Sequence, residues 1–202
     1  LLCFMTAASS SHFRESLAHM ESIRKFYPCR PVYVYDLGIT ESEQSVMKRY
    51  GNVHFLQLQM SRPFVEFNGK AFKGPMFVDM INRVRTRQLQ CNVVSYGDAH
   101  TMLISKYDHR AFAEVRRLGL VADRAVQNWP QLAMTHPGMF PYFGVDRENE
   151  FKQLRRHNEM LQVQSGLMLI DPRNRTTLDK LFTPWSDCCL DANCLSPGKK
   201  LL

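Results

Sequence analysis

Short apolar runs alternate with helical patterns along most of this chain, and this alternation restricts the fold more than any other feature. Residues 3–8 form an apolar run of strand length, and residues 31–36 (Pro-Val-Tyr-Val-Tyr-Asp) are almost entirely apolar. Such strands are typical of a parallel sheet that helices cover on both faces. Residues 53–58 and 93–96 supply two further strand patterns. The sequence therefore predicts an α/β domain with a mostly parallel central sheet flanked by helices.

Helical patterns fill the intervals between these runs. Phe13, Leu17 and Met20 recur near the 3.6-residue period of a helix, and Pro28 ends that pattern. The serines at 9–11 offer side chains that could cap it. Similar helical patterns cover residues 41–50, 72–84 and 112–118.

The second half of the chain is less regular. Residues 127–147 are rich in proline and glycine and predict a long ordered loop. We expect a strand over 161–170 that is broken at 164–166, a short helix over 177–182, and an irregular tail from 183. The length of 202 residues, with 45% hydrophobic and 22% charged residues, fits one packed domain and excludes fibrous or disordered classes.

The charge balance favours anionic partners. Lysine and arginine exceed aspartate and glutamate by enough to give a net charge of +7, which suits nucleotide phosphates or acidic glycans, although a solvated basic surface is the alternative. No block of five like charges and no zinc-type cysteine spacing occurs, so we expect no nucleic-acid partner.

No apolar run approaches a membrane span. Because the chain begins with Leu1, we expect a fragment whose signal or anchor lies upstream.

The pair Asp98-Ala-His100 is the sharpest chemical feature. It follows a buried strand pattern directly, and ligands bind at the carboxyl ends of strands in open α/β sheets. A carboxylate and an imidazole two residues apart suit Mn²⁺, or less well Mg²⁺, when diphosphate oxygens complete the coordination. The alternative is an ordinary turn that ends a strand.

Several segments together resemble a known fold family. They are Thr6-Ala-Ala-Ser9, Tyr35-Asp36-Leu-Gly38, Lys73 at the start of an apolar helix, and the strand before Asp98. They resemble the GT-A glycosyltransferases, in which an Asp-x-Asp motif, with Asp-x-His as a variant, follows the fourth strand. Residues 134–143, 164–166 and 184–197 look like a narrower, uncharacterised metazoan group, expanded in nematodes and placed with the nucleotide-diphospho-sugar transferases.

The resemblance implies roles for individual residues. Residues 1–100 would be the nucleotide-binding half of a single domain over 1–202, and residues 101–202 the acceptor-side half. Asp98 and His100 would bind the metal. The implied donor-binding residues are Thr6, Ala7, Ala8, Ser9, Asp36, Lys73, Gln164 and Gly166. Each has a structural alternative: for Asp36 a turn cap before Gly38, and for Lys73 a solvated cation at a helix start.

The catalytic residue stays unassigned in this interpretation, with Glu159 and Gln164 as weak candidates. The family continues beyond its Cys-Pro-Gly stretch into a helix with a late His-containing motif. This chain ends at Leu202 without it, so we expect an incomplete acceptor-side half.

The resemblance implies a metal-dependent transfer of sugar from a nucleoside-diphosphate-sugar donor, a UDP-sugar, to a hydroxyl of a glycan or glycoprotein. The alternative is a truncated or degenerate domain that binds nucleotide, glycan or a partner protein.

We expect the full protein in the secretory pathway, in the Golgi, held by a type II anchor outside this chain. The Asn174-Arg-Thr sequon fits this setting, as does a disulfide between Cys188 and Cys194, for which Cys189 is an alternative partner.

Overall fold

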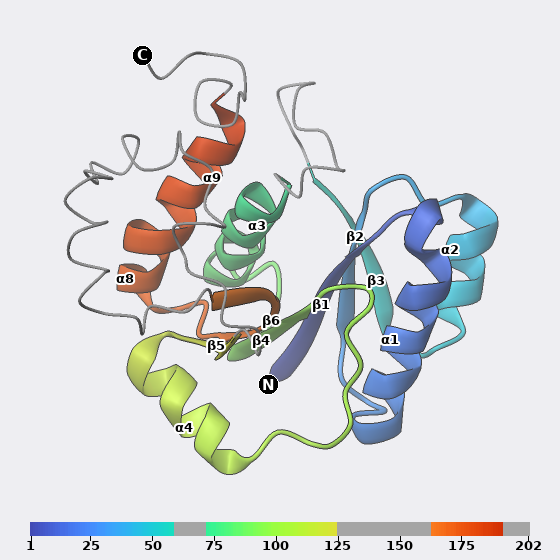
Figure 1. Cartoon of the computed structure of the whole chain (residues 1–202), viewed down its shortest axis with the longest axis horizontal. Helices are drawn as coiled ribbons and strands as arrows, with labels where there is room; N and C mark the ends of the chain where they lie inside the picture. Colours follow the sequence, from blue (N-terminus) through green and yellow to red (C-terminus); the bar gives the residue numbers. More distant parts are fainter. Residues whose placement is uncertain (59–71, 125–162, 192–202) are drawn as a thin grey trace, which may run out of the picture.

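A single six-stranded sheet forms the centre of the molecule (Figure 1). The structure, a computed structural model, describes residues 1–58, 72–124 and 163–191. Strand order across the sheet is β3-β2-β1-β4-β6-β5. The strands are β1 (Leu2–Ala8), β2 (Val32–Asp36), β3 (Val53–Gln57), β4 (Val93–Gly97), β5 (Leu120–Arg124) and β6 (Val163–Ile170). Neighbours from β3 to β4 are parallel, whereas β6 runs antiparallel to both β4 and β5. The expected mostly parallel α/β sheet is confirmed.

Helices cover both faces of this sheet, which explains why its central strands are apolar throughout. The helices are α1 (Phe13–Phe26), α2 (Glu41–Lys48), α3 (Lys73–Arg85), α4 (His109–Leu118), α8 (Arg175–Thr177) and α9 (Thr183–Leu190). Short η segments cover Ser10–His12 and Leu178–Phe182. In Figure 1, α1 and α2 lie on one side of the sheet, and α3 and α9 on the other. Along β1, Cys3 and Met5 face the core under α3, and Phe4 faces the core under α1.

The segment from residue 183 is helical, so the expected irregular tail is wrong over Thr183–Leu190. Pro184 lies in the first turn of α9, where its missing N–H costs no helical hydrogen bond. Helix α9 packs on α3 so closely that a Cβ on Gly74 would come 2.9 Å from the Ser186 backbone. Trp185 packs against the core beside Phe77, with ring centroids 5.5 Å apart.

Strand β6 extends over Val163–Ile170, so the chain stays in one strand through the predicted break at residues 164–166. Its pairing with β5 is nevertheless irregular there: the neighbours Ala122 and Asp123 of β5 pair with Met168 and Gln164. The extra residues therefore lie in β6, close to the predicted break. Strand β5 itself was not predicted. It begins just after Gly119, which ends α4 in a left-handed conformation with φ of 84°.

A disulfide links Cys3 to Cys91, 88 residues apart in sequence. It joins β1 to the segment just before β4, at the ends of these strands opposite the candidate site. Cys188 is also disulfide-bonded. Cys194 lies outside the described residues, so their pairing stays a prediction. Cys189 is a buried free thiol whose pKa burial raises to about 11.

Candidate functional site

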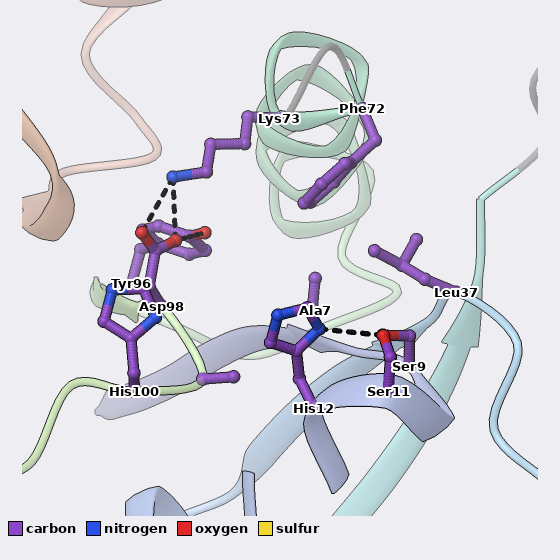
Figure 2. Close-up of a pocket in the computed structure, with 11 residues that line it drawn as sticks. Ala7, Ser9, Ser11, His12, Leu37, Phe72, Lys73, Tyr96, Asp98 and His100 are labelled. Atoms are coloured by element: carbon purple, nitrogen blue, oxygen red, sulfur yellow. Dashed lines mark hydrogen bonds and ion pairs between the residues drawn. The ribbon is translucent and has the colours of Figure 1, made fainter. Parts of the chain in front are cut away.

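A pocket of about 210 Å³ opens where the parallel strands β1 and β4 end. Figure 2 shows its wall: the turn after β1, the start of α3 and the turn after β4 supply most of it. The residues that line the pocket are Ala7, Ser9, Ser11, His12, Leu37, Phe72, Lys73, Tyr96, Asp98, Ala99 and His100. This is the sheet edge where ligands bind in open α/β folds.

A buried ion pair lies in this pocket. The Lys73 Nζ atom is 2.7 Å from Asp98 Oδ1 and 3.0 Å from Oδ2, so it contacts both carboxylate oxygens. The two side chains are only 3% and 12% exposed. The Tyr96 hydroxyl donates a further hydrogen bond to Oδ1 of Asp98. Burial, and then the negative charge of Asp98, raise the pKa of Tyr96, which keeps this hydroxyl protonated as a donor.

The turn that carries Asp98 is fixed to strand β6. The Asp98 N–H donates to the Gly166 carbonyl at 2.8 Å, and the Thr101 hydroxyl donates to the same carbonyl at 3.0 Å. A Cβ on Gly166 would lie 3.5 Å from Asp98 Oδ2, an ordinary contact. Gly166 therefore belongs to the site through its backbone, which positions the carboxylate.

His19 supports the same turn from beneath, and sequence reasoning missed it. Its Nδ1–H donates to the Thr101 carbonyl, and its ring packs against Gly97, where a Cβ would come 3.0 Å from Nε2. Burial lowers the pKa of His19, against the opposing effects of the Thr101 hydrogen bond and the charge of Asp98. The imidazole is therefore neutral, with its proton on Nδ1. The sequence signal for His19 was its position: it is a polar residue on the buried face of α1, together with Ser16, Met20 and Ile23.

Asp36 is the last residue of β2, at the same edge of the sheet, but it does not line the pocket. Its Oδ1 accepts hydrogen bonds from the backbone N–H groups of Gly38 and Ile39, each at 2.9 Å. Its Oδ2 accepts from Gln44 at 2.9 Å and from Gln57 at 3.0 Å. These contacts make Asp36 a cap of the turn before Gly38, which the sequence analysis gave as the alternative to donor binding.

The remaining predicted donor-binding residues divide between the pocket and the core. Ala7 and Ser9 line the pocket, whereas Thr6 and Ala8 are buried and do not. Gln164 lies in β6, where the structure describes its backbone alone. Glu159 lies outside the described residues.

The sequon asparagine is used locally. Asn174 Oδ1 accepts a hydrogen bond from the Thr177 N–H at 3.0 Å and caps α8. Its Nδ2 atom lies against Gly119, where a Cβ would be 2.6 Å away. A glycan on this nitrogen would therefore have to clear the end of α4.

Polar groups also line the opposite wall of the pocket: Ser9 was predicted there, whereas Ser11 and His12 had been given no role. His12 Nδ1 lies 3.0 Å from the Ser11 hydroxyl and 3.3 Å from the Ser9 hydroxyl, as Figure 2 shows. Phe72 and Leu37 add apolar surface beside them. The signal for these residues was their place within a few positions of a strand end or a helix start.

A divalent cation held by protein side chains alone does not fit the described part of the chain. No group of three or more His, Cys, Asp or Glu residues converges there. Asp98 offers the right oxygen ligands and His100 lines the same pocket, but both oxygens of Asp98 already contact the Lys73 ammonium. A cation here needs further ligands from an anion, and it also needs Lys73 to move away from Asp98.

Comparison with solved structures identifies the fold. A galactosyltransferase, LgtC, solved with donor and acceptor sugar analogues, has a TM-score of 0.57 at 13% identity over 93% of this chain and 64% of its own. Core-mannan synthase A from Aspergillus fumigatus, solved in its Mn/GDP form, has a TM-score of 0.55 at 9% identity, over 94% of this chain and 64% of its own.

Mouse xyloside xylosyltransferase 1, solved in its apo form, has a TM-score of 0.51 at 10% identity, over 96% of this chain and 73% of its own. The chain thus has the GT-A fold of nucleotide-sugar glycosyltransferases, and it spans 64% of the length of the first two structures.

Sequence comparison is less informative. A family model described as a protein of unknown function (DUF1647) matches residues 1–90, the part of the chain that runs from β1 past α3. No curated protein sequence matches the chain. None of the helices that the structure describes is long and apolar enough to cross a membrane.

Proposed function

We propose that the pocket binds a nucleoside-diphosphate sugar, a UDP-sugar, and that the protein transfers the sugar to a hydroxyl of a glycan or glycoprotein. The observation that carries this proposal is the Lys73–Asp98 pair in a pocket at the carboxyl ends of β1 and β4. The GT-A fold supports it, since similar structures were solved with donor and acceptor sugar analogues and with Mn and GDP.

The residues of the pocket suit the parts of such a donor. Lys73 supplies a buried cation for the diphosphate, and the net charge of +7 favours the approach of an anion. Ser9 and Ser11 offer hydroxyl groups, which can bond ribose or phosphate oxygens. Phe72 and Leu37 offer apolar surface for the base. A divalent cation, Mn²⁺ or Mg²⁺, would join Asp98 and the diphosphate, neutralising charge on the leaving group.

Calorimetry with UDP tests this proposal. We expect binding that needs Mn²⁺ and that weakens at least about tenfold in Asp98→Asn, as removal of a group that orients or holds a metal typically does. Asp36→Asn is the matched control, because it makes the same change outside the pocket, and circular dichroism checks that both variants fold. Equal affinity for UDP in Mn²⁺ and in EDTA would reject the role of the cation.

A second candidate is a transferase-like domain that binds nucleotide or glycan without catalysis. The lack of a third cation ligand among the described residues favours it. Transfer needs donor, cation and acceptor in one geometry, and small misplacements cost on the order of 100-fold. A donor-hydrolysis and transfer screen with UDP-sugars in Mn²⁺ separates the two. Hydrolysis of the donor or transfer to an acceptor would support the enzyme, and UDP binding without any turnover would support the second candidate.

Placement in the secretory pathway, in the Golgi with an anchor outside this chain, forms part of the proposal. The Cys3–Cys91 disulfide and the disulfide at Cys188 support an oxidising compartment. Peptide mapping of secreted, unreduced protein tests it. Free thiols at Cys3 and Cys91 would remove this support, and the same map decides whether Cys188 pairs with Cys194.

A further inference from the structure

We infer that Lys73 keeps divalent cations off Asp98 until a diphosphate group draws its ammonium away. This inference deepens the proposed function and rests on it for the identity of the anion. Its consequence is that a cation and a diphosphate enter this pocket together, and that the cation alone does not bind.

The geometry of the ion pair carries the argument. Lys73 Nζ lies within 3.0 Å of both oxygens of Asp98, and the Tyr96 hydroxyl takes a further position on Oδ1. A carboxylate has about four acceptor positions. Three are used here, and the charge of the group is balanced by a lysine side chain that is 3% exposed.

Burial makes this arrangement selective against a second cation. Two like charges beside one carboxylate are weakly screened in a site from which water is largely excluded. Asp98 could therefore accept a divalent cation only if the ammonium moved. A guanidinium would hold the carboxylate as a rigid fork, but the lysine head is a compact charge on a flexible stem and can change partner.

Asp98 is the one carboxylate among the described residues that line the pocket, so an anion bound in the same pocket is the new partner that we infer for the displaced ammonium. Figure 2 shows the Lys73 side chain extending from the start of α3 to Asp98. His12 and the hydroxyls of Ser9 and Ser11 form the opposite wall and supply no carboxylate. A diphosphate there would be close to Lys73 and would itself supply oxygen ligands to the cation. The diphosphate draws the Lys73 ammonium away from Asp98, and the cation balances the negative charge of the diphosphate. The binding of each therefore favours the binding of the other, and this coupling is reciprocal.

Equilibrium dialysis of Mn²⁺ against the purified chain tests this inference. We expect no measurable binding of Mn²⁺ alone to the native chain and clear binding when inorganic pyrophosphate is present. Lys73→Met keeps the length of the stem but removes its charge, and should bind Mn²⁺ alone at least about tenfold more tightly than the native chain. Lys73→Arg should bind none. The gain in Lys73→Met should vanish when Asp98→Asn is added. Lys180→Met, at an exposed lysine of the Leu178–Phe182 segment, is the matched control.

Two outcomes would overturn the inference: equal Mn²⁺ affinity of the native chain with and without pyrophosphate, or no gain in a folded Lys73→Met variant. If circular dichroism shows that Lys73→Met does not fold, the two native-chain measurements decide alone. The proposed function fails separately: the Mn²⁺ and pyrophosphate pattern would stand while UDP failed to bind. The reverse result, UDP binding in Mn²⁺ together with tight binding of Mn²⁺ alone, would reject the inference and keep the function.

Discussion

Two turns at the same edge of the sheet each begin with an aspartate, yet they hold it in opposite ways. Asp36 ends β2 and Asp98 follows β4, and only strand β1 separates these two strands in the sheet. Asp36 accepts two backbone N–H groups of its own turn and two glutamine amides. Asp98 instead contacts the side chains of Lys73 and Tyr96 in a pocket.

The difference lies in what would have to move to free each carboxylate. Releasing Asp36 would break the turn, because the Gly38 and Ile39 N–H groups are part of the backbone that it closes. Releasing Asp98 requires only that the side chains of Lys73 and Tyr96 change, with no change in the backbone of the turn. A carboxylate at a strand end is thus available for binding when side chains hold it, and structural when the backbone does.

The largest expected effect is that of Asp98→Asn on stability. The change leaves the Lys73 ammonium without its counter-charge at 3% exposure. Removal of one partner from a buried ion pair typically costs about 3–5 kcal/mol. We expect urea unfolding to show a loss of that size, and the double variant with Lys73→Met to recover part of it. A loss below about 1 kcal/mol would mean that water reaches Lys73 and that the pair is not needed.

Gly97→Ala should have the next largest effect. The new Cβ would come 2.5 Å from Cε1 of His19, so the ring must move from under the Thr101 carbonyl. Overpacking of this kind costs about 1–3 kcal/mol, and here it should also weaken nucleotide binding. Gly38→Ala is the control in the Asp36 turn. Its Cβ meets nothing within 4 Å, but φ is 101°, so it should lower stability through backbone strain and leave binding unchanged. Unaltered UDP affinity in Gly97→Ala would refute the supporting role of His19.

The sequence predicted the parts of this arrangement that depend on local pattern. Buried strands and amphipathic helices leave a periodic signal, and the rule for strand ends then located Asp98. Lys73 came from the resemblance to the GT-A glycosyltransferases. The contact between them was not predictable, because it depends on how α3 packs beside β4. The Cys3–Cys91 pair was missed for a related reason, since sequence alone does not choose among pairings.

Helix α9 and His19 were missed because their signals are weak in sequence. Helix α9 buries Ser186, Cys188 and Cys189, small or polar residues that do not form an obvious apolar stripe. His19 contacts a carbonyl 82 residues away, so the pattern of α1 alone could mark it only as a polar residue on a buried face.

Mild acid should weaken the Asp98 turn before the Asp36 turn. The pKa of His19 lies below 6.5 in the folded chain because of burial, so the unfolded chain takes up this proton first as pH falls. The free energy of unfolding should then decrease from near pH 6.5 downward, by at most about 1.4 kcal/mol per pH unit for one proton. His19→Asn keeps an N–H donor but does not titrate. The difference between the variant and the native chain in how the free energy of unfolding depends on pH therefore isolates the contribution of His19. Identical profiles would contradict the prediction.

The Asp36 turn responds in a lower range. Burial raises the pKa of Asp36, but the hydrogen bonds from Ile39, Gly38, Gln57 and Gln44 outweigh burial, and the pKa lies below 3.8. A carboxyl whose folded pKa is lowered stabilises the fold above its unfolded value and loses that effect as pH falls through the folded one. Between pH 7 and pH 5 this turn should therefore contribute no change.

The smallest expected effect is that of Asp36→Asn, although the same change of aspartate to asparagine at Asp98 should have the largest. Asparagine closes the same kind of turn, because its Oδ1 can accept from the Gly38 and Ile39 N–H groups as the carboxylate does. The lost acceptor faces the amides of Gln44 and Gln57, which can rotate to present oxygen instead of nitrogen to the new amide. We expect a loss of about 1 kcal/mol in urea unfolding, the typical net value of one hydrogen bond, and an unchanged affinity for UDP in Mn²⁺. A loss as large as that of Asp98→Asn, or a matching loss of UDP affinity, would show that Asp36 serves the pocket and that the two turns do not differ in kind.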